Sequence, residues 1–252
     1  MFITKVKRRL KLYKALLADI FRFMSRKVLN SKSAAILMYH TVGNGPESLG
    51  VDMFRRQMKW LKDHNYNVVR LSQVVSSLKN GHIIASKTVV LTFDDGYADN
   101  YIEALPILRE FGFPATIFII TNLIDSKLTN KRGVQHTMLS RSQIKEMHNS
   151  GLIEFQPHTV KHTRLSYLSD MEAEAELKDS QETIKSHLSV QGHIFAYPFG
   201  DHTQRDVQLA KKYFDAAVTV SPGFAGSSND IFLLPRQAIG QHTTMLRFRL
   251  HI

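Results

Sequence analysis

The chain of 252 residues is 43% hydrophobic and 22% charged, which excludes a disordered or low-complexity protein and suits one large domain. It contains no Cys, so disulfides, thiolate metal sites and cysteine catalysis are excluded, and any metal must be held by His and carboxylates. The formal charge of +11 is uneven: ten Lys and Arg against one acid give +9 in residues 1–32, whereas the other 220 residues carry 23 basic and 21 acidic side chains. Because a nucleic-acid-binding globule needs a basic face of its own, we expect no nucleic-acid partner.

Residues 1–32 are predicted to form a basic amphipathic helix, because their apolar residues recur at steps of three and four. Lys and Arg interrupt this segment up to Lys14, so it lacks the apolar run of a secretory signal, and the sequence has no run long enough for a spanning helix. Two interpretations stay open: a helix lying on an anionic membrane face, and a helix packed on the domain or on a partner. In both cases we expect a cytoplasmic protein, peripheral on the inner face of the membrane in the first.

Residues 33–252 alternate short apolar runs with amphipathic stretches, which predicts one α/β domain with a parallel sheet or barrel. The expected strands are Ala34–Met38, Thr88–Phe93, Ala115–Ile120, Leu152–Phe155, Ile194–Tyr197, Ala216–Val220 and Phe232–Ile239. The expected helices are Met53–His64, Leu71–Leu78, Asn100–Glu110, Arg141–Asn149, Met171–Leu188 and Arg205–Tyr213.

Two adjacent carboxylates, Asp94 and Asp95, directly follow the strand expected at 88–93. Successive side chains of an extended segment point in different directions, so one carboxylate can bind a metal while the other stays available as a base. Gly96 then allows a sharp turn. Since Asp-Gly also marks ordinary surface turns, a pair of solvated acids remains the alternative for this motif alone.

Two histidines, His158 and His162, follow the strand expected at 152–155, within the segment FQPHTVKHTRL. Twelve His in a chain of this length would give roughly 0.6 such pairs by chance, so the spacing alone is weak. Two imidazoles and one carboxylate, however, make a three-ligand site with an open position for water, as catalytic zinc requires.

Two further strand ends carry polar turns. His40 ends one of them, in ILMYHTVG, and Gly200 lies in the other, FAYPFGD, where it permits close approach of the backbone to a ligand. A polar insert, SKLTNKRGVQHTM at residues 126–138, is expected to be either a rim loop that contacts substrate or a disordered loop. The strand ends together favour a functional site at the carboxyl edge of the sheet.

The motifs LTFDDGY, HTVKHTRL and YPFG, in this order, resemble those of the polysaccharide deacetylases of carbohydrate esterase family 4. The resemblance runs from about Ala34 to Ile239, and the early MYH with MFRRQMKWLKDHNYNVVRLSQVV is similar to the circularly permuted branch of bacterial poly-N-acetylglucosamine deacetylases. It implies a single distorted (β/α) barrel of about seven parallel strands. It also implies a metal-dependent hydrolase that removes N-acetyl groups from N-acetylglucosamine-type sugars of a polysaccharide or glycolipid precursor.

The resemblance also implies roles for individual residues. Asp94 is the expected general base and His40 the expected general acid. A divalent metal, most commonly zinc, is expected on Asp95, His158 and His162. The expected substrate groove is formed by Tyr197, Pro198, Phe199 and Gly200, with the Phe199 N–H helping to hold the oxyanion.

The sequence departs from the family pattern at two places. Many members have an Arg before the Pro of the third motif, where this chain has Ala196. Arg236 is the expected replacement, because an Arg fork can pair with Asp94, and a purely structural ion pair is the alternative. The Trp that lines the acetyl pocket in many members has no counterpart. These departures leave open a catalytically impaired carbohydrate-binding protein. Two further alternatives are His242 as the acid and a de-O-acetylase, since water activation by a metal and an Asp serves both kinds of bond.

Overall fold

The structure is a computed structural model that describes residues 32–129, 133–188 and 192–252, with the backbone alone for residues 187–188. The predicted amphipathic helix of residues 1–32 therefore lies outside the described residues, apart from Lys32. Within the described part of the chain, no helix has the length and apolar character needed to span a membrane.

A parallel sheet forms the centre of the fold, with the strand order β10, β1, β3, β4, β7. The bounds are β1 (Ala35–Tyr39), β3 (Thr88–Phe93), β4 (Ala115–Ile119), β7 (Ile153–Pro157) and β10 (Gln237–Ala238). A short strand, β2 (Asn67–Val69), pairs with the first half of β3, and β4 pairs with the end of β3 on the same side. β1, β3 and β4 are buried along their whole length, as strands covered on both faces must be.

A second parallel pair, β8 (Ile194–Ala196) and β9 (Ala216–Val218), continues the predicted barrel order. Leu234 bridges β9 at Val218, and the same segment then reaches β10, which pairs with β1. Among the described residues no ladder joins β7 to β8; there, the Ile194 N–H donates to the Gln156 side chain at 2.9 Å. The α/β class is thus confirmed, and backbone pairing follows the barrel order without closing between β7 and β8.

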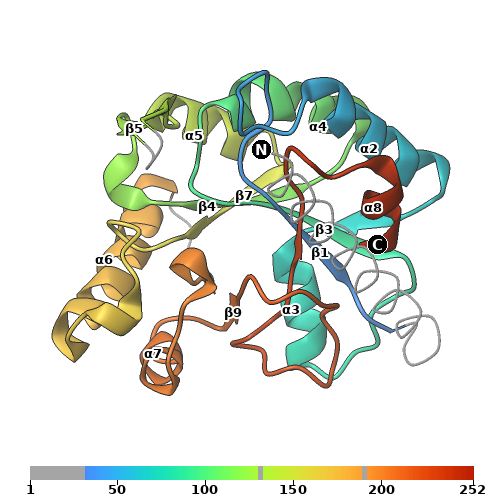
Figure 1. Ribbon diagram of the computed structural model, residues 1–252. Coiled ribbons are helices and arrows are strands. Elements are labelled where there is room, and N and C mark those ends of the chain that lie inside the picture. The colour runs from blue at the N-terminus through green and yellow to red at the C-terminus, as the bar shows by residue number, and fades with distance from the viewer. Residues whose placement is uncertain (1–31, 130–132, 189–191) are drawn as a thin grey trace, which may run out of the picture.

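Alternating strand residues face two different layers of the core. Inward-facing residues of both sheets, among them Ile36, Val90, Phe118, Ala196 and Val218, share one buried cluster with helix α3. The outward-facing residues pack against helices: α2, α4, α5 and α8 cover the main sheet, and α6 and α7 cover the β8–β9 pair. Figure 1 shows α2, α4 and α5 on one side of the central strands, with α3 and α7 on the other. The helices span Val51–Asp63 (α2), Leu71–Lys79 (α3), Leu105–Phe111 (α4), Arg141–Asn149 (α5), Asp170–Leu188 (α6), Gln204–Ala210 (α7) and Met245–Leu250 (α8).

The strand predicted at Phe232–Ile239 is wrong over most of its length. Only Gln237–Ala238 is strand, and Leu234 makes an isolated bridge, because Pro235 between them has no N–H to donate to a ladder. The helix predicted at Asn100–Glu110 begins with a π turn, η1 (Asn100–Ala104), and continues as α4. The polar insert contains an antiparallel hairpin of β5 (Lys127–Thr129) and β6 (Gln135–Thr137).

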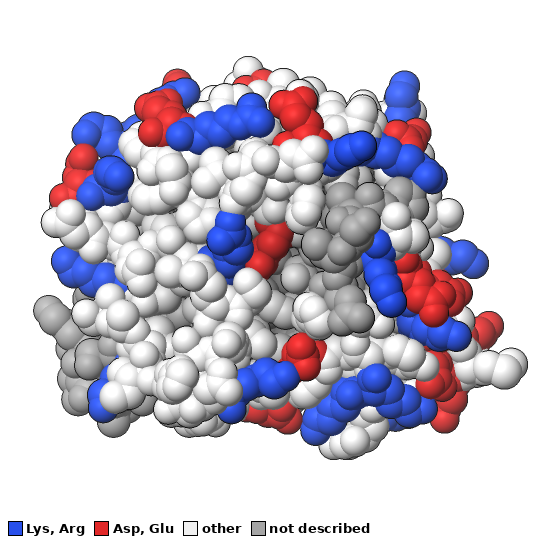
Figure 2. Space-filling view, turned by 180° about the vertical axis from the view of Figure 1, so that it is seen from behind, with Lys and Arg blue, Asp and Glu red and all other residues white. Residues whose placement is uncertain are grey.

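Charged side chains are mixed in sign on the face shown in Figure 2. Lys and Arg alternate there with Asp and Glu around the edge, and the middle of the face is mostly uncharged.

Candidate metal centre and active site

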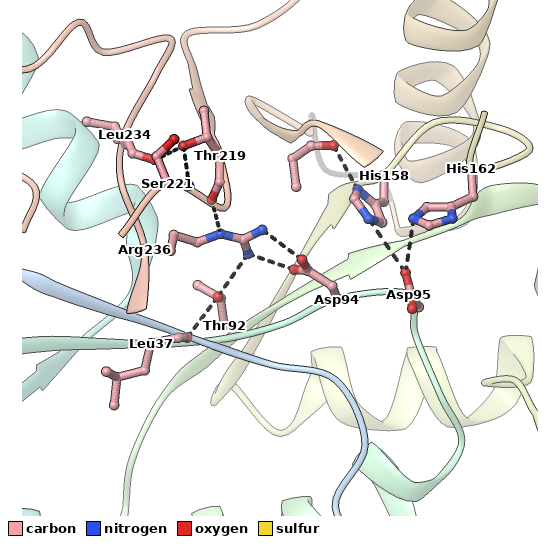
Figure 3. Close-up of polar contacts among 11 residues, drawn as sticks. Leu37, Thr92, Asp94, Asp95, His158, His162, Thr219, Ser221, Leu234 and Arg236 are labelled. Carbon is pink, nitrogen blue, oxygen red and sulfur yellow. Dashed lines mark hydrogen bonds and ion pairs between the residues drawn. The ribbon is translucent and has the colours of Figure 1, made fainter. Parts of the chain in front are cut away.

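The two adjacent carboxylates after β3 point in different directions. The Asp94 N–H donates to the Tyr39 carbonyl at 2.9 Å, which extends the β1–β3 ladder by one residue. Asp95 then adopts a left-handed conformation with φ of 74°, followed by Gly96 at 83°. In Figure 3, Asp94 therefore faces Arg236 while Asp95 faces the two histidines. The two carboxylates therefore face different partners, which agrees with the expectation that one binds a metal while the other stays available as a base.

Arg236 holds both oxygens of Asp94. Its Nη1 and Nη2 donate to Oδ1 and Oδ2, each at 2.7 Å, while Nε donates to the Thr219 carbonyl at 2.8 Å. Nη1 also donates to the Thr92 hydroxyl at 3.2 Å, and the guanidinium lies over the Phe118 ring. Arg236 is fully buried. The predicted pairing of Arg236 with Asp94 is present as a bidentate ion pair.

This ion pair controls the protonation of Asp94. Burial alone would raise the pKa of Asp94, but the charge and hydrogen bonds of Arg236 outweigh it and hold that pKa well below its usual range. The nearby His158 and His40 act in the same direction. Asp94 is therefore an ionised, oriented carboxylate inside the protein.

Asp95, His158 and His162 converge to form a compact cluster. Oδ1 of Asp95 lies 3.5 Å from Nε2 of His158 and 3.4 Å from Nε2 of His162, and this oxygen is buried without a hydrogen-bond partner. Two ligands about 2.0–2.1 Å from a tetrahedral cation are separated by about 3.4 Å, so the spacing fits such an ion. The three residues form the metal-ligand cluster found among the described residues.

Both imidazoles are arranged as neutral ligands. Nδ1 of His158 lies 2.7 Å from the Ala196 carbonyl, which fixes the proton on Nδ1 and leaves the lone pair of Nε2 directed at the cluster. Burial lowers the pKa of His162 to about 4. A neutral imidazole is the form that binds metal.

A tight turn, not a helix, brings the two histidines together. Thr159 and His162 have φ of 64° and 58°, and the His162 N–H donates to the Thr159 hydroxyl at 2.9 Å. Glu176 of α6 accepts the Val160 and Lys161 N–H groups at 2.8 and 2.9 Å. No local sequence pattern predicts Glu176, because its contacts are with backbone groups.

Phe199 lies at the edge of this cluster. It is 46% exposed, adopts φ of 60°, and its ring centroid lies 4.5 Å from that of His162. The Arg164 guanidinium lies 4.4 Å from the same ring. Gly200 follows with φ of 68°, where an added Cβ would lie 2.3 Å from Cγ2 of Val220.

The other members of the predicted groove motif do not line a groove with their side chains. Tyr197 is fully buried in the core with β8 and α7, and Pro198 is buried beneath the turn. The packing of these two buried side chains supports the turn at Phe199 and Gly200.

His40 is exposed at the end of β1 and borders a cavity beside the cluster. Its charge acts on the pKa values of Asp94 and His162, which places it close to both. The cavity has a volume of about 200 Å³ and is lined by His40, Thr41, Glu47, Tyr97, His136, Ile239 and Gly240. Burial and a hydrogen bond with Asp95 raise the pKa of Tyr97, which links this cavity to the metal cluster. Tyr97 is the last residue of the motif LTFDDGY, whereas no sequence pattern marks Glu47.

Comparison with known proteins identifies the family. The family model described as polysaccharide deacetylase matches residues 83–214, more than half of the chain. The chain belongs to the polysaccharide deacetylase family. The family's members are carbohydrate deacetylases, hydrolases of carbon–nitrogen bonds. Asp94, Asp95, His158 and His162 lie within the matched range, and His40 and Arg236 lie outside it.

Individual relatives agree with this assignment. The deacetylase is 34% identical over 204 residues to YxkH of Bacillus subtilis (strain 168), a protein named as a polysaccharide deacetylase, with 80% of this chain and 69% of YxkH covered. The solved structure of Streptococcus pyogenes deacetylase PplD in complex with acetate matches with a TM-score of 0.76 and 30% identity, covering 86% of this chain and 96% of PplD. A poly-beta-1,6-N-acetyl-D-glucosamine N-deacetylase of Escherichia coli (strain K12) is 24% identical over 235 residues, covering 80% of this chain. The match spans 35% of that relative's length.

Proposed function

We propose that this deacetylase hydrolyses the N-acetyl group of N-acetylglucosamine-type residues in a surface polysaccharide or its glycolipid precursor, with zinc as the metal. The observation that carries the proposal is the adjacency of two buried units, the Asp94–Arg236 ion pair and the Asp95–His158–His162 cluster. One unit offers an ionised base and the other a metal site, as amide hydrolysis requires.

The substrate class rests on the relatives. The Escherichia coli protein is named for N-deacetylation of poly-beta-1,6-N-acetyl-D-glucosamine, and PplD was solved with acetate, the acid that deacetylation releases. The cavity beside His40 has polar and aromatic lining side chains suited to the hydroxyls and ring of a sugar, and we place the acceptor sugar there.

The chain's own residues divide the chemistry of amide hydrolysis. A divalent cation on Asp95, His158 and His162 supplies Lewis acidity, which lowers the pKa of water and polarises a carbonyl. Asp94, held ionised by Arg236, accepts the proton of the attacking water. The Phe199 N–H, at the rim of the cluster, donates to the developing oxyanion.

His40 completes the reaction as the general acid. An amine leaves an amide only when it receives a proton, and His40, exposed at the end of β1 beside the cavity, is our candidate donor. The product pair is then free acetate and a glucosamine-type amine. His242 is the alternative acid, and it is exposed on the turn that precedes α8.

The first experiment is acetate release from N-acetylglucosamine oligomers by zinc-reconstituted protein. Asp94→Asn and His158→Ala are expected to abolish release, while the matched controls Asp63→Asn and His82→Ala retain it, because both control side chains are exposed and lie outside the site. An O-acetylated sugar is assayed in parallel to detect a de-O-acetylase. Stoichiometric metal binding without acetate release from either substrate would contradict the proposal and favour the catalytically impaired carbohydrate-binding protein.

A further inference from the structure

The side chains of Asp99 and Asn100 hydrogen-bond to the backbone of the turn that carries His40. Asn100 Nδ2 donates to the His40 carbonyl at 2.9 Å and to Oδ1 of Asp99 at 2.9 Å. The Asp99 carboxyl in turn accepts the backbone N–H of Val42. Asp99 and Asn100 therefore contact the turn on both sides of Thr41.

The local fold makes Asn100 a rigid support. Its side chain is 1% exposed, and both hydrogens of its amide group are used in the contacts just described. Asn100 begins the η1 turn, where the Leu105 N–H donates to the Asn100 carbonyl in the i to i+5 pattern of a π helix. Its own N–H donates to the Tyr97 carbonyl at 3.0 Å. π turns are uncommon and recur at functional sites, where they aim a side chain that an α helix would direct elsewhere.

The His40 imidazole depends on this backbone support for its position. The ring is exposed. In the described part of the chain, the contact between η1 and His40 is the hydrogen bond from Asn100 to the His40 carbonyl. On the other side, the turn is tied down by the Leu49 N–H, which donates to the Thr41 carbonyl at 3.1 Å. Loss of the Asn100 contact would free one end of the turn and let the ring move relative to the cluster.

We propose that Asn100 is a positioning residue for proton donation to the leaving group, acting through the His40 carbonyl to hold the imidazole at the cavity beside the metal cluster. The inference rests on the proposed function, in which His40 is the acid. It assigns no chemical step to Asn100 itself.

The test compares two substrates that differ in their need for an acid. Departure of an amine from an N-acetylglucosamine oligomer requires a proton, whereas p-nitrophenolate leaves p-nitrophenyl acetate without one. Both reactions use the same metal, base and oxyanion contacts. A residue that acts only through the acid therefore affects the amide and spares the ester.

Asn100→Ala is expected to lower kcat/KM for the oligomer ~10- to 100-fold, the loss typical of a reacting group displaced by about 1 Å, and to leave ester hydrolysis unchanged. His40→Ala is expected to show the same selectivity with a loss of ~10²–10⁴-fold. In the double variant, Asn100→Ala is expected to add no further loss, because its effect passes through the imidazole that is already gone. Asn80→Ala is the matched control, since the Asn80 amide also donates to a backbone carbonyl but lies at the C-cap of α3, away from the site.

The outcomes separate the inference from the proposed function. If His40→Ala is selective for the amide and Asn100→Ala lowers both activities equally, or neither, the positioning role is overturned while the acid stands. Additive losses in the double variant overturn it as well. If His40→Ala itself lowers both activities equally, the proposed acid is wrong and the inference falls with it. Retained ester hydrolysis shows, within the same experiment, that the Asn100 variant has folded and kept its metal site.

Discussion

Arg236 and Asp94 meet in the protein interior through two parallel hydrogen bonds of 2.7 Å, although they are 142 positions apart in the chain. Both side chains are almost completely buried. A buried carboxylate left without its partner costs about 3–5 kcal/mol, so the pair is held together once it forms. Arg236 thereby supplies what Ala196 cannot, a fixed cation beside the proposed base.

Removing Arg236 should move the acidic limb of the pH profile. In Arg236→Met, burial raises the pKa of Asp94 without an opposing charge, so Asp94 becomes protonated, and unable to accept a proton, at a higher pH than in the wild type. The acidic limb of kcat/KM is therefore expected to shift to higher pH. Arg236→Lys keeps the positive charge but loses the two parallel hydrogen bonds of the guanidinium, so an intermediate shift of the acidic limb is expected. The measurement is the pH dependence of acetate release.

Two controls keep this prediction specific. Arg55→Met removes an exposed ion pair with Glu110 and is expected to leave the pH profile in place and to change the free energy of unfolding by less than about 1 kcal/mol. If Arg236→Met fails to fold, the Lys variant still carries the test. A uniform loss of activity with an unmoved acidic limb would show that Arg236 does not set the protonation of Asp94.

Glu176 should support metal binding without touching the metal. Its carboxylate holds the Val160 and Lys161 N–H groups and so fixes the turn between His158 and His162. Glu176→Gln is expected to weaken zinc affinity by ~10- to 100-fold, as changes behind the metal ligands commonly do. Competition with a chromophoric chelator measures the affinity. Glu172→Gln is the matched control, because the exposed Glu172 carboxylate also accepts a backbone N–H, that of Ser169. Equal zinc affinities in the two variants would contradict the role of Glu176.

The parts of the site that the sequence predicted are those that follow from strand ends. Asp94, Asp95 and His158 lie at the carboxyl ends of β3 and β7, and parallel strands bring such positions to one edge. Glu176 and Asn100 could not be predicted, because each acts on backbone groups of a distant turn. Neither contact has a spacing rule in the sequence.

The fold was predictable where hydrophobic runs were long and unpredictable where elements were short. β3 and α5 have the predicted bounds, since a buried strand and a capped amphipathic helix each give a strong local pattern. β2, with three residues, and α8, with six, are too short to show a period. At Phe232–Ile239 the apolar composition favoured a strand, but Pro235 prevents a continuous ladder.

The metal-free protein should lose stability as the pH falls from about 6.5 to 4. The folded-state pKa of His162 is lowered to about 4 from an ordinary 6.5, so between these values the unfolded chain binds a proton that the folded chain does not. The free energy of unfolding therefore has its full His162 contribution above pH 6.5 and loses up to about 3 kcal/mol on the way to pH 4. In His162→Gln this part of the slope is expected to disappear, whereas the exposed-site control His82→Gln keeps it. Urea unfolding in the presence of a chelator measures both slopes, and identical slopes in wild type and His162→Gln would contradict the assignment.

Gly200→Ala should lower the free energy of unfolding by more than the left-handed backbone conformation of Gly200 alone explains. Gly200 and Gly81 have nearly equal φ, 68° and 67°, but an added Cβ meets Val220 at 2.3 Å in the first case and nothing within 4 Å in the second. Gly81→Ala is expected to cost about 1–2 kcal/mol for the left-handed conformation. Gly200→Ala should add about 1–3 kcal/mol for the contact with Val220, and acetate release should fall as the Phe199 N–H moves.

A double-mutant cycle separates the two contributions to this loss. Val220→Ala removes the methyl groups that the new Cβ would strike, so Gly200→Ala in that background is expected to cost close to what Gly81→Ala costs. Denaturant unfolding of the wild type, the two single variants and the double variant gives the coupling. An equal cost for Gly200→Ala with and without Val220 would show that the turn relaxes around the added carbon and that close packing against Val220 does not hold Phe199 in place.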